Sequence, residues 1–247
     1  MEHIVNKKPV FDAVRLLLGR RFTQDEVEAL DRALDCALKA SRPLGALSER
    51  FESGGRGAGA VSSGAGDPGG VSYGIWQLSS KAGTAAQFVA EEGVRWRAEF
   101  AGNPPGSAAF SAAWRAIASR EPDAFGEAQR NFIERTHYRP AVAAIRRGTA
   151  LNLDARQDAV RDAVWSVAVQ HGAAARILGD AVARADAVTG RMDAGYDRAL
   201  VEAIYAVRTD YVLRLAARSG AAARRTLENV ARNRYSAELA DALEMLA

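Results

Sequence analysis

Two carboxylates, a run of glycines and several polar and aromatic residues lie close together between positions 51 and 78. Glu52 follows an apolar segment, and Asp67 comes later within the glycine-rich stretch. Cleavage of a glycosidic bond needs an acid that protonates the leaving oxygen, and many enzymes add a second carboxylate that activates water or stabilises an oxocarbenium ion. This segment therefore has the residue types for cutting a sugar chain.

The spacing around Glu52 favours it as the general acid. Such an acid must keep its proton near neutral pH, and an apolar pocket achieves this by raising the pKa. Glu52 lies at the predicted end of a helix after apolar residues, whereas the rival Glu49 lies in mid-helix and is expected to be exposed. Asp67, surrounded by glycines, is expected to be hydrated and ionised, and Ser72 is placed to hold a water between the two carboxylates.

The residues after the glycines suggest substrate contacts. Tyr73 and Trp76 could offer ring faces to pyranose units, and Gln77 could hydrogen-bond an N-acetyl or hydroxyl group. Each feature also has a plainer interpretation: the aromatic residues could be core, Asp-Pro-Gly-Gly could be a turn, and the glycine tract could be a flexible linker. The linker interpretation is disfavoured because the tract is interrupted by Asp67-Pro68 and leads directly into the aromatic segment.

Apolar residues recur at spacings of three and four along most of the chain, which predicts helices. The strongest pattern covers residues 154–171, where Trp165 falls in the apolar stripe and is expected to be core, and residues 199–215 form another long helix. Strand-like alternation is confined to a few residues around 71–78. The sequence therefore predicts a mainly α fold with a minimal β element at residues 60–78.

The first forty residues predict a separate pair of helices. Thr23 and Glu26 form a capping box, in which the hydroxyl accepts from the Glu26 amide and the carboxylate reaches back. We expect residues 1–42 to form a helical leader packed on a main domain of residues 43–247.

Composition limits the other possibilities. The chain has 247 residues, a formal net charge of +3 and a single cysteine, Cys36, which excludes an internal disulfide framework. The mild basic bias suits an anionic partner such as cell-wall polymer or nucleic acid, although Arg-rich composition alone explains it equally well. No apolar run is long enough for a membrane helix, and the charged N-terminus is not typical of a signal peptide. We expect synthesis in the cytoplasm and no membrane insertion.

The order Glu52-Ser53, Asp67, then Ser72-Tyr73-Gly74-Ile75-Trp76-Gln77 resembles the catalytic segment of the lysozyme-like superfamily. Soluble lytic transglycosylases have a similar Glu-Ser and Gly-Leu-x-Gln, and phage-type lysozymes and chitosanases a similar Glu, Asp and Ser or Thr before Gly. The whole run resembles more closely the lysozyme-like modules of phage tail, endolysin and type VI secretion spike proteins. Segments like NFIERTHYRPA and VWSVAVQHG follow in those modules too, so the likeness covers roughly residues 44–240. The gap between Glu52 and Asp67 is longer than in the short phage lysozymes.

This resemblance implies a lysozyme-like helical domain that cleaves the β-1,4 bonds of peptidoglycan glycan strands, as a phage endolysin or antibacterial effector acting at the cell wall. It implies catalytic roles for Glu52, Asp67 and Ser72. It also places His137, Tyr138, Gln170 and His171 near the floor of the cleft, where they would bind substrate. A histidine that ends a helix, as His171 does, is also a plain partner for the helix dipole.

The resemblance implies no cofactor, no metal and no nucleic acid, and a monomer whose further partners would be an immunity protein or a secretion or tail component. Two enzymatic alternatives remain: a lytic transglycosylase, in which Glu52 acts alone, and a chitosanase. A non-catalytic tail or wall-binding module is the alternative from a different class.

Overall fold

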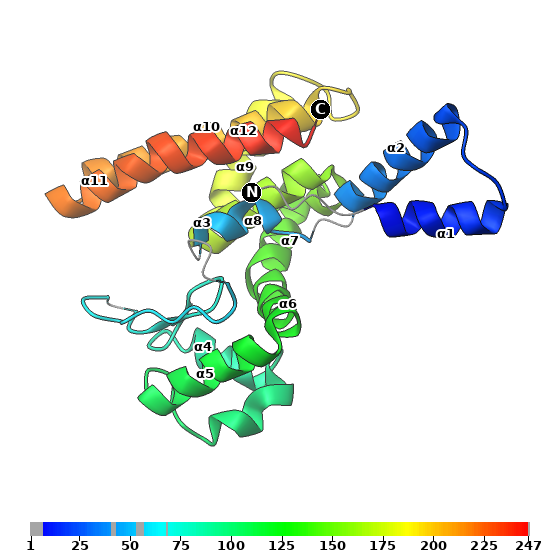
Figure 1. Cartoon of the computed structure of the whole chain (residues 1–247). Helices are drawn as coiled ribbons and strands as arrows, with labels where there is room; N and C mark the ends of the chain where they lie inside the picture. The colour runs from blue at the N-terminus through cyan, green and yellow to red at the C-terminus, as the bar shows by residue number, and fades with distance from the viewer. Residues whose placement is uncertain (1–6, 41–42, 53–56, 68, 247) are drawn as a thin grey trace. The chain divides into compact units, whose positions relative to one another are not determined.

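The computed structural model describes residues 7–40, 43–52, 57–67 and 69–246, and the chain divides into two compact units, Met1–Pro43 and Leu44–Ala247 (Figure 1). The structure shows this division into two units. The packing of the leader on the main domain stays a prediction.

The first unit contains two helices. Helix α1 spans Lys8–Leu18 and ends at Gly19, which has a left-handed backbone with φ 63°, and α2 spans Gln24–Ala40. The predicted capping box is confirmed: the Glu26 amide donates to Thr23 Oγ1 at 3.3 Å, and the Thr23 amide donates to Glu26 Oε2 at 2.9 Å. These two bonds satisfy amide groups that would otherwise lack partners at the start of α2.

The second unit is mainly helical, which confirms the mainly α prediction. Its α-helices are α3 (Ala46–Glu52), α4 (Thr84–Ala90), α5 (Ala108–Arg120), α6 (Pro122–Ile133), α7 (Arg139–Thr149), α8 (Asp158–Gln170), α9 (Ala174–Asp186), α10 (Tyr196–Ala217), α11 (Ala221–Asn229) and α12 (Tyr235–Glu244). Short 3-10 helices η1 (Val94–Phe100) and η3 (Leu153–Ala155) and π-helices η2 (Glu134–Tyr138) and η4 (Val230–Arg234) lie between them.

The β element is as small as the sequence predicts. Strands β1 (Ser72–Tyr73) and β2 (Leu78–Ser79) pair antiparallel, with Ser72 opposite Ser79 and Tyr73 opposite Leu78. An isolated bridge between Val61 and Tyr73 adds the preceding loop to this hairpin. Because a two-stranded hairpin is marginal by itself, it depends on the helices packed against it.

A nearly continuous rod of helix connects two groups of elements in the second unit. Helix α6, π-helix η2 and α7 follow one another without a break from Pro122 to Thr149. Figure 1 shows the hairpin, α4 and α5 beside α6, and α8, α9 and α10 gathered beyond it. Pro140 has no N–H to donate to the preceding turn, and the wider π turn before it lets the rod continue past this residue.

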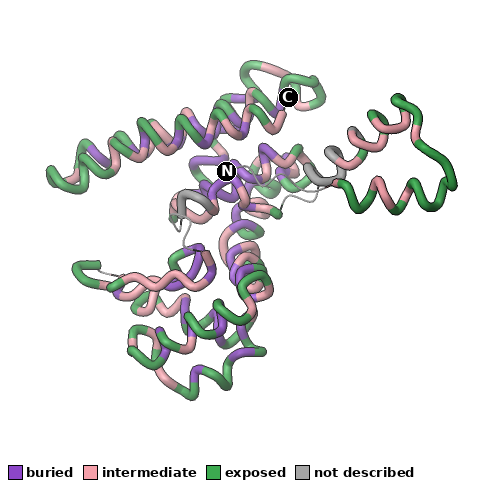
Figure 2. The backbone as a smooth tube through the Cα atoms, in the orientation of Figure 1, coloured by how far each residue is buried: buried purple, intermediate pink, exposed green. Residues whose placement is uncertain are grey.

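Each group has its own buried cluster (Figure 2). Aromatic residues fill the first, with ring centroids 4.4–6.3 Å apart; they include Phe88, Phe100, Phe110, Trp114 and Phe125. In the second, α8 is buried on nearly every side, and Trp165 is 0% exposed, which confirms its prediction as a core residue. The two clusters belong to one contiguous core.

Candidate functional site

Helix α3 ends at Glu52, and buried contacts fix its beginning. The carboxylate of Asp162, on α8, accepts from the amides of Gly45 at 2.7 Å and Leu47 at 3.0 Å. Asp162 is only 3% exposed, and a carboxylate at a helix N-terminus is stabilised by the helix dipole as well as by these bonds. Gly45 has φ +89°, and a Cβ there would lie 2.6 Å from the indole of Trp165, so only glycine fits.

The middle of α3 is tied to α6. Glu49, the rival acid, forms a salt bridge with Arg130 at 2.9 Å, and the two side chains are 32% and 18% exposed. Glu49 is therefore partly buried and paired rather than exposed as the sequence suggested, because the guanidinium of Arg130 on α6 reaches it. The side chains of Phe51 and Glu52 lie outside the described residues, so the role of Glu52 stays a prediction.

The glycine-rich tract is folded onto the hairpin wherever it is described, which differs from the linker interpretation. The Ser62 amide donates to the Ser72 carbonyl at 2.9 Å, and the Gly74 amide donates to the Ala60 carbonyl at 2.7 Å. The indole of Trp114, on α5, donates to the Ala58 carbonyl at 2.8 Å. The tract therefore lies along the hairpin and is held there by backbone hydrogen bonds.

Asp67 and Ser72 are carried by this β element. Asp67 is exposed, as expected, and its Oδ1 accepts from the Gly69 amide at 2.7 Å in the turn that the sequence suggested. Ser72 is partly buried, and its amide donates to Ser62 Oγ at 2.8 Å. Both residues therefore have positions fixed by local hydrogen bonds.

Gln129, on α6, holds the hairpin from the inside. Its Oε1 accepts from the Ile75 amide at 3.0 Å, and its Nε2 donates to the Ala58 carbonyl at 3.1 Å. The residue is 0% exposed. A Cβ on Gly74, which has φ +74°, would lie 2.1 Å from Gln129 Oε1, so the close approach requires glycine. Sequence analysis missed Gln129 because its partners lie more than fifty residues away.

Gln129 and Arg130 are adjacent on α6, and between them they bind the hairpin and helix α3. Gln129 holds the hairpin that carries Asp67 and Ser72, and Arg130 holds the helix that ends at Glu52. Helix α3 and the hairpin are therefore both attached to α6 at neighbouring positions, and the meeting of Glu52, Asp67 and Ser72 stays a prediction.

Tyr73 and Trp76 lie in the core, which differs from the expected ring platforms. Tyr73 is 0% exposed, and Trp76 is 5% exposed. The Tyr73 hydroxyl shares a 2.9 Å hydrogen bond with Ser111 Oγ and accepts from the Gly106 amide at 2.8 Å. Trp76 packs edge-on against Trp165, with ring centroids 5.3 Å apart.

Gln77 is the exposed member of the same segment. Its φ is 53°, a left-handed value that few residues other than glycine adopt. The strain places an amide side chain at the surface of the hairpin.

His137 and His171 lie on one cavity of about 330 Å³. It is formed by the π-helix η2, the start of α7, the end of α8 and the start of α9. Burial lowers the pKa of His137. Burial, with smaller contributions from Arg208 and Arg234, lowers the pKa of His171 to about 3.

Gln170 is engaged in a buried network rather than directed at solvent. Its Oε1 accepts from the Tyr235 hydroxyl at 2.7 Å and from the Arg208 guanidinium. Arg208 also forms a salt bridge of 3.0 Å with Glu238, and both side chains are 0% exposed. The network joins α8, α10 and α12.

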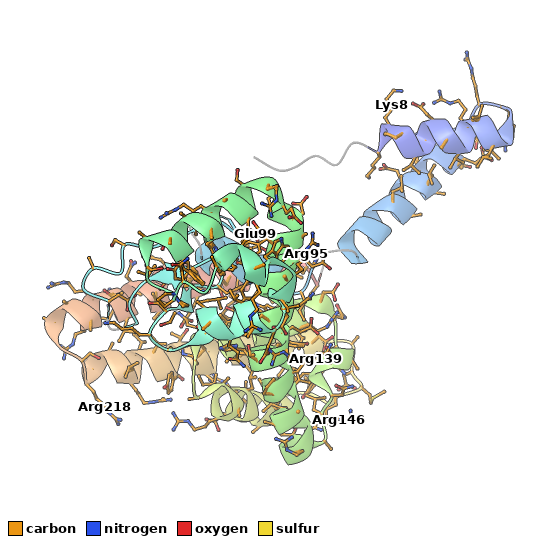
Figure 3. The ribbon with its side chains drawn as sticks, turned by 90° about the horizontal axis from the view of Figure 1, so that it is seen from below. Lys8, Arg95, Glu99, Arg139, Arg146 and Arg218 are labelled. Carbon is orange, nitrogen blue, oxygen red and sulfur yellow. The ribbon has the colours of Figure 1, made fainter. Side chains whose placement is uncertain are left out.

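Tyr138 is 2% exposed, and its hydroxyl donates to Asp154 Oδ1 at 2.9 Å. Burial is the main reason that its pKa is raised above the ordinary value. A hollow of about 300 Å³ lies beside it, lined by Arg139 and Arg146 among others; Figure 3 shows these two arginines along α7. Tyr138 thus lines this hollow as a buried side chain and does not extend into solvent.

In the described part of the chain, no three side chains of His, Cys, Asp or Glu come together as a group that could hold a metal ion. No helix of that part combines the length and the apolar composition needed to cross a lipid bilayer.

The fold and site define a mainly α protein with a small β-hairpin held against a central helical rod. Residues 44–236 match the family described as "Type VI secretion system spike protein VgrG3-like, C-terminal". The chain belongs to this family. It is also 39% identical over 140 residues to the type VI secretion system spike protein VgrG3 of Vibrio cholerae serotype O1. The aligned part is 57% of this chain but only 14% of that relative.

Proposed function

We propose that this chain cleaves the β-1,4 bonds of peptidoglycan glycan strands, as a muramidase-like glycoside hydrolase. The observation that carries the proposal is the double attachment to α6. Adjacent residues Gln129 and Arg130 hold the hairpin of Asp67 and Ser72 and the helix that ends at Glu52. A pair of carboxylates on two rigid supports is what acid-assisted glycoside cleavage requires.

In this mechanism Glu52 protonates the leaving oxygen of the scissile bond. Asp67, exposed on its turn, assists a water molecule or stabilises the developing oxocarbenium ion, and Ser72 positions the water. Gln77 offers its exposed amide to the sugar. Tyr73 and Trp76 do not contact the sugar in this mechanism; their buried rings hold the hairpin in place.

The family relationship supports a cell-wall-acting effector carried by a secretion spike, since the relative from Vibrio cholerae is named as a spike protein. In this proposal the chain is delivered to the wall of a target cell, and an immunity protein protects the producing cell. A phage endolysin is the alternative route to the same substrate.

The test is loss of turbidity of purified cell walls with wild type, Glu52→Gln and Glu49→Gln. Removing a general acid costs about 10²–10⁴-fold in rate, so Glu52→Gln should lose nearly all lysis while its circular dichroism stays unchanged. Glu49→Gln changes a second carboxylate of the same helix, and because it also removes the salt bridge to Arg130, it should slow lysis, but far less than Glu52→Gln does. Undiminished lysis by Glu52→Gln would refute the assignment.

Mass analysis of the released fragments and a second substrate separate the alternatives. A lytic transglycosylase needs no second carboxylate, so it would tolerate Asp67→Asn and release 1,6-anhydro products instead of reducing ends. A chitosanase would act on deacetylated chitosan. Binding to walls without any release of fragments would indicate a non-catalytic module.

A further inference from the structure

Helices α10 and α11 form a projecting pair whose outer end is basic. The stretch between Asp210 and Glu228 contains four arginines and no acidic residue. Figure 1 shows α10 and α11 reaching beyond the other helices of the second unit, and Figure 3 shows Arg218 at the end of this pair. We call residues 213–225, which include the four arginines and the turn between the helices, the basic tip.

Three of the four arginines lack a carboxylate partner. Arg214, Arg218 and Arg225 are exposed, and no described residue forms a salt bridge with them. Exposed arginines elsewhere in the second unit are commonly paired; Arg120, for example, binds Glu99 at 2.7 Å. The tip therefore carries positive charge that no described carboxylate neutralises.

The spacing of these charges is unfavourable for the chain alone. Arg214 and Arg218 lie one turn apart on α10, about 6 Å along its axis, and like charges at this spacing destabilise a helix. Arg224, the fourth arginine, donates to the carbonyls of Ala216 and Ala217 at 3.3 Å and so caps the end of α10. The other three serve no such bond, and an anionic partner would relieve their repulsion.

Apolar side chains share the tip with the arginines. Leu213 is 39% exposed and Leu215 is 44% exposed, on either side of Arg214 in the sequence. At an anionic bilayer, arginine heads reach the lipid phosphates while leucines bury apolar surface between the headgroups. A hydrated anionic polymer offers nothing to the leucines. The projecting end of two helices is also convex, which suits a flat surface better than a single polymer chain.

We propose that the basic tip binds the surface of an anionic phospholipid bilayer, with Arg214, Arg218 and Arg225 at the lipid phosphates and the two leucines between the headgroups. The contact is peripheral and inserts no helix across the bilayer. It is independent of the proposed hydrolase, because it requires neither a glycan nor any of the proposed catalytic residues.

Co-sedimentation of the full chain with lipid vesicles tests the proposal. Wild type should bind vesicles of one part phosphatidylglycerol to three parts phosphatidylcholine, and pure phosphatidylcholine vesicles should bind far less. Added salt should release the protein, because it screens exposed charges. The triple variant Arg214→Gln/Arg218→Gln/Arg225→Gln should bind about 100-fold more weakly, since each arginine at an anionic surface strengthens binding by about fivefold.

A matched triple variant controls for net charge. Arg97→Gln/Arg115→Gln/Arg147→Gln removes the same charge from three exposed positions outside the tip, and no described residue forms a salt bridge with these arginines either. It should weaken vesicle binding by no more than about threefold, because charges more than a Debye length from the bilayer are largely screened. Circular dichroism should be the same for wild type and both triple variants.

The leucines separate a bilayer from a soluble polyanion. Leu213→Ser/Leu215→Ser should weaken vesicle binding by about five- to tenfold at every salt concentration, because it removes apolar surface from the contact. Binding to polyglutamate, the polymer probe, should not respond to this change. If circular dichroism shows that the leucine variant is unfolded, the two arginine variants decide the outcome.

No binding to the anionic vesicles, equal binding to neutral vesicles, or equal losses in the two arginine variants would overturn the proposal. Polyglutamate bound as tightly as the vesicles, with no loss of vesicle binding in a folded leucine variant, would assign the tip to polyanions and reject the bilayer.

Discussion

Acidification is expected to destabilise the fold through His171. Burial first, then Arg208 and Arg234, lowers the pKa of this imidazole to about 3, from 6.5 for an ordinary histidine. Between these values the unfolded chain binds a proton that the native protein does not, so stability is complete above pH 6.5 and falls as the pH decreases. At pH 5 the loss is about 2 kcal/mol, because 1.5 pH units at 1.36 kcal/mol each separate pH 5 from the unfolded value.

The measurement is urea unfolding of wild type and His171→Gln at pH 7.5 and pH 5.0, followed by tryptophan fluorescence. Glutamine is chosen because its amide oxygen can still accept from Arg208. Wild type should lose about 2 kcal/mol more than the variant between the two pH values, and the comparison cancels the contributions of other groups, His137 among them.

The choice of pH 5 separates His171 from Glu238. Burial works against the charge of Glu238, but Arg208 and Arg234 outweigh it and lower the pKa of this carboxyl below 4.5. Its stabilisation is present above pH 4.5 and lost only as the pH falls further. Equal losses for wild type and His171→Gln at pH 5, or an NMR titration of His171 near pH 6.5, would refute the reasoning.

Three further predictions concern the supports of the site, each measured by urea unfolding. Gly74→Ala should cost about 2–4 kcal/mol from overpacking against Gln129 and the positive φ; a cost below 1 kcal/mol would mean that the close contact is wrong. Asp162→Ala leaves two helix amides without their acceptor and should cost about 2–5 kcal/mol, with a slower rate of wall lysis; Asp162→Asn, which keeps one acceptor oxygen, should cost clearly less. Glu238→Gln strands the buried Arg208 charge and should cost about 3–5 kcal/mol, whereas the double variant Arg208→Met/Glu238→Leu should cost less than the sum of the single changes. Additive effects would show that the pair is not coupled.

Local patterns in the sequence predicted the elements well. The capping box at Thr23 and Glu26 depends on residues three positions apart, and the structure confirms both of its bonds. The end of α3 at Glu52 and the burial of Trp165 likewise follow from signals within one or two turns of helix. The helical spacing found along most of the chain also includes α9, whose buried stripe contains Ile177, Leu178, Ala181 and Val182.

The supports of the site could not be predicted in the same way. Asp162 binds amides 117 and 115 positions away, and Gln129 binds partners 54 and 71 positions away. No periodicity connects such residues. A fully buried arginine such as Arg208 also contradicts the ordinary expectation that charged residues are exposed. Its burial becomes understandable only when Glu238 and the ring of Tyr235, 4.0 Å from the guanidinium carbon, are seen around it.

The aromatic residues of the hairpin show why residue type alone misleads about a binding surface. A sheet of two-residue strands has too few backbone bonds to be stable by itself, so its large side chains must be buried against the helices. Tyr73 and Trp76 serve this purpose, and the polar residues beside them, Asp67 and Gln77, are left exposed. The left-handed backbone of Gln77 costs free energy that the rest of the hairpin must offset, and strain of this kind concentrates where a side chain serves function. The substrate contacts of the proposed hydrolase are therefore expected from the polar edge of the hairpin rather than from its rings.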